Sequence, residues 1–181
     1  MSVSIEQIEN FFPEDISKFV SQYYIRKAQY RYGEIDKPNQ EPTGLTAQSF
    51  LYQDKTSHYI DDDSRMIYDS FVEYVDDRYN GFSIENQYIR LYCNCFAPRE
   101  YGTFHTDSDD SGYYTFLYYP VHEYDYDIEE GGWTEFHIDD KILGIIPKPN
   151  SIVRFSSQII HRATPMRNHT RFSVALKSMP K

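Results

Sequence analysis

Three residues of the types that bind metals stand where folding could bring them together. His105 and Asp107 are separated by one residue, and His161 follows much later in the chain. In an extended segment, side chains two positions apart point to the same face, so His105 and Asp107 would lie side by side. Two imidazoles and one carboxylate on one face of an iron(II) ion leave positions open for a chelating oxo-acid and for O2. The spacing therefore predicts an open iron site.

A cation with a neighbouring hydroxyl follows the last histidine. Arg171 stands ten residues after His161, and Ser173 would point the same way on an extended strand. A guanidinium fork beside a hydroxyl is well suited to a carboxylate, and here it could hold the distal carboxylate of 2-oxoglutarate. A His-x-Asp tripeptide occurs by chance in many chains. The coincidence of three ligand types with this cation favours a metal site over a histidine pair satisfied by core hydrogen bonds.

Short strands separated by turns must position these residues. The second half of the chain predicts strands at 85–96, 103–107, 113–120, 132–138, 142–147, 151–156, 161–164 and 171–177. About eight short strands at this spacing are typical of a β-sandwich or barrel. The 18 Tyr and 12 Phe agree, because aromatic residues suit a half-buried sheet surface.

The first part of the chain adds two helices. Strands are expected at 3–9, 29–32 and 46–52, one helix opening at Pro13-Glu14-Asp15, and a second helix at 64–79. Asp63 or Ser64 would cap the second helix, and Asn80-Gly81 would end it. No repeat or linker divides the chain. We therefore expect one domain, 1–181, in which 1–82 covers the larger sheet and 83–181 forms the core that carries the motifs.

Composition excludes several classes of protein. The net charge is −10 and no basic stripe is present, so duplex nucleic acid is not an expected partner. Neither a signal peptide nor a run long enough to span a membrane is visible, and no membrane partner is expected. Cys93 and Cys95 would stand too far apart on a strand for an easy disulfide. Two small buried residues in a reduced, cytoplasmic protein are the expectation.

From Arg90 to Lys177 the sequence resembles the double-stranded β-helix core of the 2-oxoglutarate- and iron(II)-dependent dioxygenases. The similarity is to the prolyl-4-hydroxylase-like branch and its small stand-alone phage and bacterial relatives. It covers about half the chain, in the stretches Arg90-Leu91-Tyr92-Cys93-Asn94, His105-Thr106-Asp107, Gly131-Gly132-Trp133-Thr134-Glu135-Phe136, Pro147-Lys148-Pro149-Asn150-Ser151, His161-Arg162-Ala163-Thr164-Pro165 and Arg171-Phe172-Ser173.

The resemblance implies a mainly β fold with a jelly-roll core and N-terminal helices packed on the larger sheet. It places iron(II) on His105, Asp107 and His161 and the oxo-acid on Arg171, with Tyr119 or Tyr92 as a second oxo-acid contact.

The implied activity is hydroxylation of a substrate with 2-oxoglutarate and O2, releasing succinate and CO2. A proline of a peptide or protein is the first substrate implied, and a free amino acid or other small metabolite is the alternative. Many collagen-type prolyl hydroxylases have lysine where this chain has Arg171, which weakens only the substrate inference. A non-catalytic metal-binding interaction module is a third reading, although such a module would not need an oxo-acid clamp.

Overall fold

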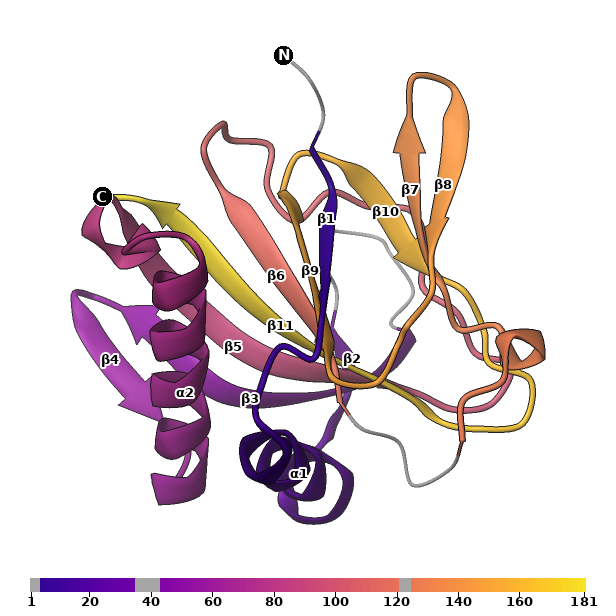
Figure 1. Cartoon of the computed structure of the whole chain (residues 1–181), viewed down its shortest axis with the longest axis horizontal. Coiled ribbons are helices and arrows are strands. Elements are labelled where there is room, and N and C mark those ends of the chain that lie inside the picture. The colour runs from indigo at the N-terminus through magenta and orange to yellow at the C-terminus, as the bar shows by residue number, and fades with distance from the viewer. Residues whose placement is uncertain (1–3, 35–42, 121–124) are drawn as a thin grey trace.

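The computed structural model is built around an eight-stranded antiparallel sheet (Figure 1). The structure describes residues 4–34, 43–120 and 125–181. In spatial order the sheet contains β1 (Glu6–Glu9), β9 (Ser151–Ser156), β6 (Tyr114–Tyr119), β11 (Arg171–Pro180), β5 (Asn86–Phe96), β3 (Thr43–Gln53) and β2 (Arg31–Glu34), with β4 (Thr56–Tyr59) paired to β3.

A smaller sheet lies over one face of the larger one (Figure 1). Its strands are β10 (Ile160–Ala163), β7 (Thr134–Ile138) and β8 (Lys141–Ile145). The apolar side chains between the sheets include Tyr92, Tyr119, Phe136 and Phe155, all buried. The expected mainly β, jelly-roll architecture is confirmed.

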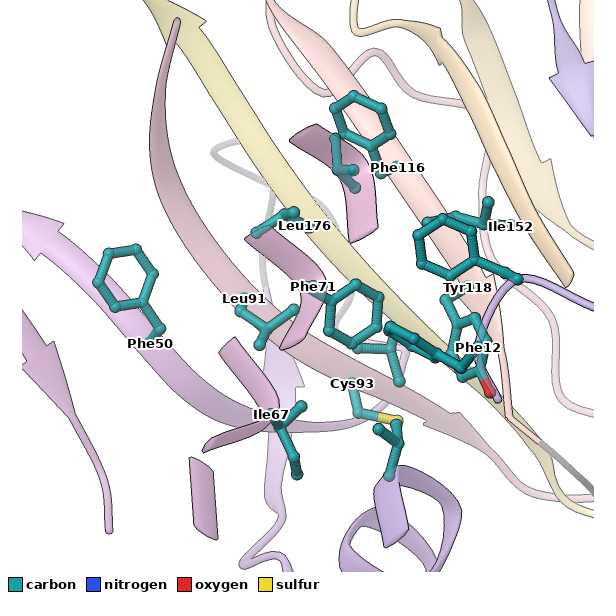
Figure 2. Packing of buried hydrophobic residues seen from close by; sticks show 14 of the residues in the cluster. Phe12, Phe50, Ile67, Phe71, Leu91, Cys93, Phe116, Tyr118, Ile152 and Leu176 are labelled. Atoms are coloured by element: carbon teal, nitrogen blue, oxygen red, sulfur yellow. The ribbon is translucent and has the colours of Figure 1, made fainter. Parts of the chain in front are cut away.

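The two helices pack against the opposite face of the larger sheet (Figure 1). They are α1 (Glu14–Gln22), continued by a π-helical turn over Tyr23–Lys27, and α2 (Asp62–Arg78). Short 3-10 turns follow at Phe82–Ile84 and Ile128–Glu130. The aromatic and aliphatic side chains that join helices to sheet are shown in Figure 2, among them Phe12, Phe50, Ile67, Phe71, Leu91, Phe116, Tyr118, Ile152 and Leu176. The predicted covering of one outer face by the helices is therefore confirmed.

Helix α2 begins earlier than the sequence predicted. Asp61 is its cap, in place of Asp63 or Ser64. The Asp61 side chain accepts a hydrogen bond from the Ser64 backbone at 2.6 Å, and Ser64 Oγ accepts one from the Asp61 backbone at 3.0 Å. This reciprocal capping box satisfies two backbone donors, whereas a cap at Asp63 or Ser64 would give up that pairing. Asn80 and Gly81 follow the helix with positive φ, as expected of its end.

One strand prediction was wrong, and one strand of the structure was not predicted. Residues 103–107 form no strand, only an isolated bridge between His105 and His161. The backbone turns after it, since both Asp107 and Ser108 donate to the carbonyl of Ser157. Strand β4 was not predicted, because its hairpin turn is made by Asp54 and Lys55 with φ of 51° and 60°, without the glycine that usually marks such turns.

The remaining strands occur where expected, with ends shifted by a few residues. The segment predicted at 29–32 forms β2 at Arg31–Glu34, and the start of the strand predicted at 3–9 lies outside the described residues. Cys93 and Cys95 are both free and buried, as predicted. Within the described ranges, no helix is both long and apolar enough to cross a membrane.

Candidate active site

His105, Asp107 and His161 converge at one end of the space between the two sheets. Their ligand atoms all lie within 4.8 Å of one another. The Nε2 atom of His105 is 3.6 Å from Asp107 Oδ1, and that of His161 is 3.7 Å from Asp107 Oδ2. The bridge to β10 and the turn at Ser157 thus bring together residues from two distant parts of the chain.

Both imidazoles are oriented by the backbone in the same way. His105 Nδ1 lies 2.9 Å from the carbonyl oxygen of Thr103, and His161 Nδ1 lies 2.9 Å from that of Ile159. A carbonyl can only accept, so each ring carries its proton on Nδ1 and presents the lone pair of Nε2 as the metal ligand. Burial lowers the pKa of His161, which favours the neutral ring that a metal requires.

The carboxylate of Asp107 is held from both sides. Thr115 Oγ1 donates to Oδ2 at 2.6 Å, and Lys177 Nζ lies 2.9 Å from Oδ1. Burial alone would raise the pKa of Asp107, but Lys177 and the two histidines outweigh it and hold that pKa well below its ordinary value. Asp107 is therefore ionised across the physiological pH range.

The donor set suits iron(II). Two neutral imidazoles and an ionised carboxylate are the ligands of the facial triad, and metal–ligand bonds of about 2.1 Å place neighbouring ligand atoms about 3 Å apart. The nitrogen–oxygen distances of 3.6 and 3.7 Å require only a small contraction to reach that spacing. No fourth His, Cys, Asp or Glu of the described residues joins this group, so it is an open rather than a closed site.

Arg171 is a buried cation whose hydrogen-bonding neighbours in the described ranges are neutral groups. It is 2% exposed, and its guanidinium donates only to neutral oxygens: Gly132 O at 2.8 Å, Ser173 Oγ at 2.9 Å and Thr134 Oγ1 at 2.9 Å. Burial lowers the pKa of Arg171. No carboxylate in the described part of the chain forms an ion pair with it. A buried charge is costly unless paired, so this cradle fits an anionic ligand such as the distal carboxylate of an oxo-acid.

A single cavity joins the metal-binding residues to this cation. Its lining includes His105, Asp107 and His161 at one end and Thr134, Arg171 and Ser173 at the other. Between Arg171 and Lys177, strand β11 turns Ser173 and Ala175 toward the interior. These small residues leave room for a ligand along the strand.

The structure resolves which tyrosines face this cavity. Tyr118 packs with the helices, whereas Tyr119 points between the sheets and its hydroxyl lies 2.6 Å from Thr134 Oγ1. Tyr119 therefore stands behind Thr134, the residue that also accepts from Arg171. Tyr92 lines the cavity nearer Asp107, and burial raises its pKa to about 12 despite nearby Lys177.

Four polar residues of the site were not found from the sequence: Asn94, Thr115, Thr134 and Lys177. Asn94 and Lys177 carried a usable signal, since they lie at even spacing from Tyr92 and Arg171 on predicted strands and so share their faces. Thr115 and Thr134 carried no usable signal in the sequence, because their roles depend on which strands pair.

The cavity mouth is edged by an arginine on an aromatic ring. The guanidinium carbon of Arg162 lies 4.3 Å from the centroid of the partly exposed Phe104 ring, and Arg162 Nη2 is 2.7 Å from Glu135 Oε2. His169 Nδ1 lies 3.0 Å from Glu130 Oε2, and His169 does not line the cavity.

Comparison with known proteins gives matches in structure alone. No family model matches the sequence, and no curated protein does. An oxidoreductase of the 2OG-Fe(II) oxygenase family from Burkholderia pseudomallei superposes with a TM-score of 0.73 at 11% identity, covering 97% of this chain and 84% of that one. A prolyl hydroxylase from Trichoplax adhaerens, in complex with a hypoxia inducible factor peptide, gives 0.72 at 16% identity, covering 99% and 84%.

A prolyl-4-hydroxylase from Pseudomonas putida gives a TM-score of 0.69 at 13% identity and covers 99% of this chain and 94% of that one. At these identities the similarity establishes a shared fold. It extends over nearly the whole chain, including the N-terminal helices.

Proposed function

We propose that this protein is an iron(II)- and 2-oxoglutarate-dependent oxygenase that hydroxylates its substrate. The observation that carries the proposal is one cavity that joins an open His-Asp-His cluster to a buried arginine, which has no acidic partner among the residues that the structure describes. Structural similarity to oxygenases supports it. We take residues 1–181 as one domain, because the helix-covered core draws side chains from both 1–82 and 83–181.

Six polar residues of the cavity have a defined task in this proposal. His105, Asp107 and His161 would hold the iron, and Arg171 with Thr134 and Ser173 would hold the distal carboxylate of the oxo-acid. When bound, iron and oxo-acid together supply the activation of O2, with release of succinate and CO2.

Aromatic rings keep water from the His161 side of the site. The Phe155 ring centroid lies 4.8 Å from that of His161, and the Phe136 centroid lies 5.8 Å away in a stacked arrangement. Two buried rings packed against the imidazole fix its plane and exclude solvent from behind it. Access to the metal is thereby limited to the cavity.

The first substrate to test is a proline in a peptide or protein, since two of the similar structures are prolyl hydroxylases. A free amino acid or other small metabolite is the second candidate, favoured by a further cation beside the cluster, Lys177. A non-catalytic interaction module is the weakest, because it gives the buried Arg171 cradle no role. Mass analysis after incubation with proline peptides or free amino acids separates the first two.

The test of the proposal is anaerobic absorption spectroscopy of the iron(II)-loaded protein. Addition of 2-oxoglutarate should produce the visible metal-to-ligand band of the chelate, and the band should be lost in His161→Ala and Arg171→Ala. A folded, iron-loaded protein that gives no band would contradict the proposal. In that case the interaction-module reading would replace it.

A further inference from the structure

Lys177 places a second buried positive charge beside the metal-binding cluster. Its side chain is 12% exposed, and Nζ lies 2.9 Å from Asp107 Oδ1 and 5.2 Å from the centroid of the Tyr92 ring. No other carboxylate of the residues described is within ion-pair distance of it. Lysine is a rare choice for such a position, because its ammonium group is strongly hydrated and costly to bury.

The charges of the complete site leave Lys177 unmatched. The distal carboxylate of 2-oxoglutarate would neutralise Arg171, while Asp107 and the other oxo-acid carboxylate would neutralise the two charges of iron(II). The neighbouring cation at the mouth, Arg162, already has Glu135 as its partner at 2.7 Å. When the charge of Asp107 is counted toward the metal, the ammonium group of Lys177 remains as one unneutralised positive charge among the described residues. An unpaired charge is unfavourable at such a largely buried position.

The position of this charge limits what could neutralise it. Lys177 follows Arg171 by six residues on β11 and faces the same side of the strand. It contacts Asp107 and Tyr92, which both line the cavity. Because Lys177 touches a metal-binding residue directly, an anion bound to it would lie close to the metal. In a substrate oxidised at that metal, the anionic group and the reacting carbon must then be separated by only a few bonds.

We propose that Lys177 selects a substrate that carries a carboxylate close to the carbon to be hydroxylated. This inference rests on the proposed function and favours the second of its two substrate candidates, free amino acids and comparable small carboxylic acids, over the first. An internal residue of a peptide lacks the carboxylate, because its carboxyl group is part of an amide. Lys177 would form a charge-assisted bond to the carboxylate and so orient the substrate.

The experiment compares acids with their carboxamides, using the visible band of the anaerobic iron(II)–2-oxoglutarate complex as a binding signal. Free L-amino acids, beginning with L-proline, and the matching amides, beginning with L-prolinamide, are titrated into the wild-type complex. One or more acids should perturb the band while their amides bind at least about tenfold more weakly, as expected when a desolvated charge pair is lost. Amides that bind as well as acids, or no response to any acid, would overturn the proposal.

Variants then assign the effect to Lys177. Lys177→Met should weaken binding of the responding acid by about tenfold or more and leave its amide unchanged, and Lys177→Arg should restore part of the loss. Lys148→Met, the same change at a surface lysine paired with Glu9, should behave as the wild type.

The affinities for iron(II) and 2-oxoglutarate are measured in each variant alongside the substrate. In Lys177→Met the affinity for 2-oxoglutarate should stay within about threefold of wild type. The affinity for iron(II) should not fall, because the loss of a neighbouring cation removes repulsion of the metal. A large loss of iron binding would mean that Lys177 only supports Asp107, and a large loss of 2-oxoglutarate binding would mean that it serves the co-substrate. Either result overturns the proposal, whereas absence of the band in the wild type speaks against the oxygenase function itself.

Discussion

His105 and His161 exchange two backbone hydrogen bonds, at 3.0 and 2.9 Å, although they are far apart in the chain. The pair is an isolated antiparallel bridge, so the two imidazoles project from directly opposed backbone positions. Each ring is then fixed by the carbonyl two residues before it. The positions of the two imidazoles are thus set in large part by main-chain contacts, whereas the third ligand, Asp107, is held by the side chains of Thr115 and Lys177.

Removal of either imidazole should therefore abolish tight metal binding without unfolding the protein. His105→Ala and His161→Ala each delete one ligand while the backbone bridge remains. We expect the affinity for iron(II) or cobalt(II) to fall by on the order of a hundredfold or more, with the circular dichroism spectrum unchanged. Titration calorimetry measures the affinity, and His58→Ala, at an exposed position on β4, is the control. Wild-type affinity in both variants would show that these residues are not ligands.

Asp107→Ala should destabilise the metal-free protein far more than His105→Ala does. The Asp107 side chain is 4% exposed and pairs with Lys177, so its removal leaves a buried ammonium without a partner. The expected loss is about 3–5 kcal/mol of unfolding free energy. Urea denaturation measures it. The double variant Asp107→Ala/Lys177→Met should recover most of that loss, and equal stabilities of the two single variants would contradict the buried pair.

Thr134→Val should weaken the binding of 2-oxoglutarate. Thr134 Oγ1 accepts a hydrogen bond from Arg171 and lies 2.6 Å from the Tyr119 hydroxyl. The methyl group that replaces this hydroxyl in valine can bond to neither the Arg171 guanidinium nor the Tyr119 hydroxyl. We expect an increase of about tenfold in the dissociation constant, since a lost hydrogen bond of a buried charged group costs about 1.5–3 kcal/mol. The visible band gives the readout and Thr56→Val, at an exposed position, the control. Unchanged affinity would remove Thr134 from the oxo-acid site.

The protein should lose stability above about pH 10, the ordinary pKa of tyrosine. Burial raises the pKa of Tyr24, Tyr88 and Tyr118 in the core, and that of Tyr23 to about 12. The folded state keeps these protons while the unfolded state releases them. Stability is therefore complete below pH 10 and falls as the pH rises toward the folded-state values.

Chemical denaturation at a series of alkaline pH values tests this. Each retained proton contributes a slope of about 1.4 kcal/mol per pH unit. Tyr118→Phe should make the unfolding free energy fall less steeply with rising pH. Tyr32→Phe, at a side chain 71% exposed, should leave that slope unchanged. A stability that is independent of pH between 9 and 11 would contradict the burial of these hydroxyls.

Much of the fold could be predicted because local pattern and tertiary structure agree. Strand β9 begins and ends where its alternation predicts, and the stripe of Ile67, Phe71 and Val75 marks the buried face of α2. Segment 103–107 was wrong because His105 forms a single bridge to β10 and the chain then turns at Asp107 to meet Ser157. Such a turn is fixed by a tertiary contact and leaves no local signal.

The residues of the site likewise divide into those that could be recognised in the sequence and those that could not. The side chains of His105, Asp107, His161 and Arg171 do come together, and their residue types are specific enough to be recognised in a sequence. Thr134 and Thr115 are common residues whose positions matter only through strand register. Lys177 was overlooked although its spacing from Arg171 places both on one face of the strand, because a lysine near the end of a strand usually reaches solvent. In the structure its ammonium group is turned toward Asp107.

Strand β1 has a further consequence for handling the protein. It forms the outer edge of the larger sheet by pairing with β9, and Gln7 ties it down through Ile146 O at 2.9 Å and Ser151 Oγ at 3.1 Å. A chain shortened to begin at Phe11 would leave β9 with unpaired backbone donors and acceptors. A bare edge of this kind recruits strands from other molecules, so shortened protein should aggregate even though every residue of the metal and oxo-acid sites is retained.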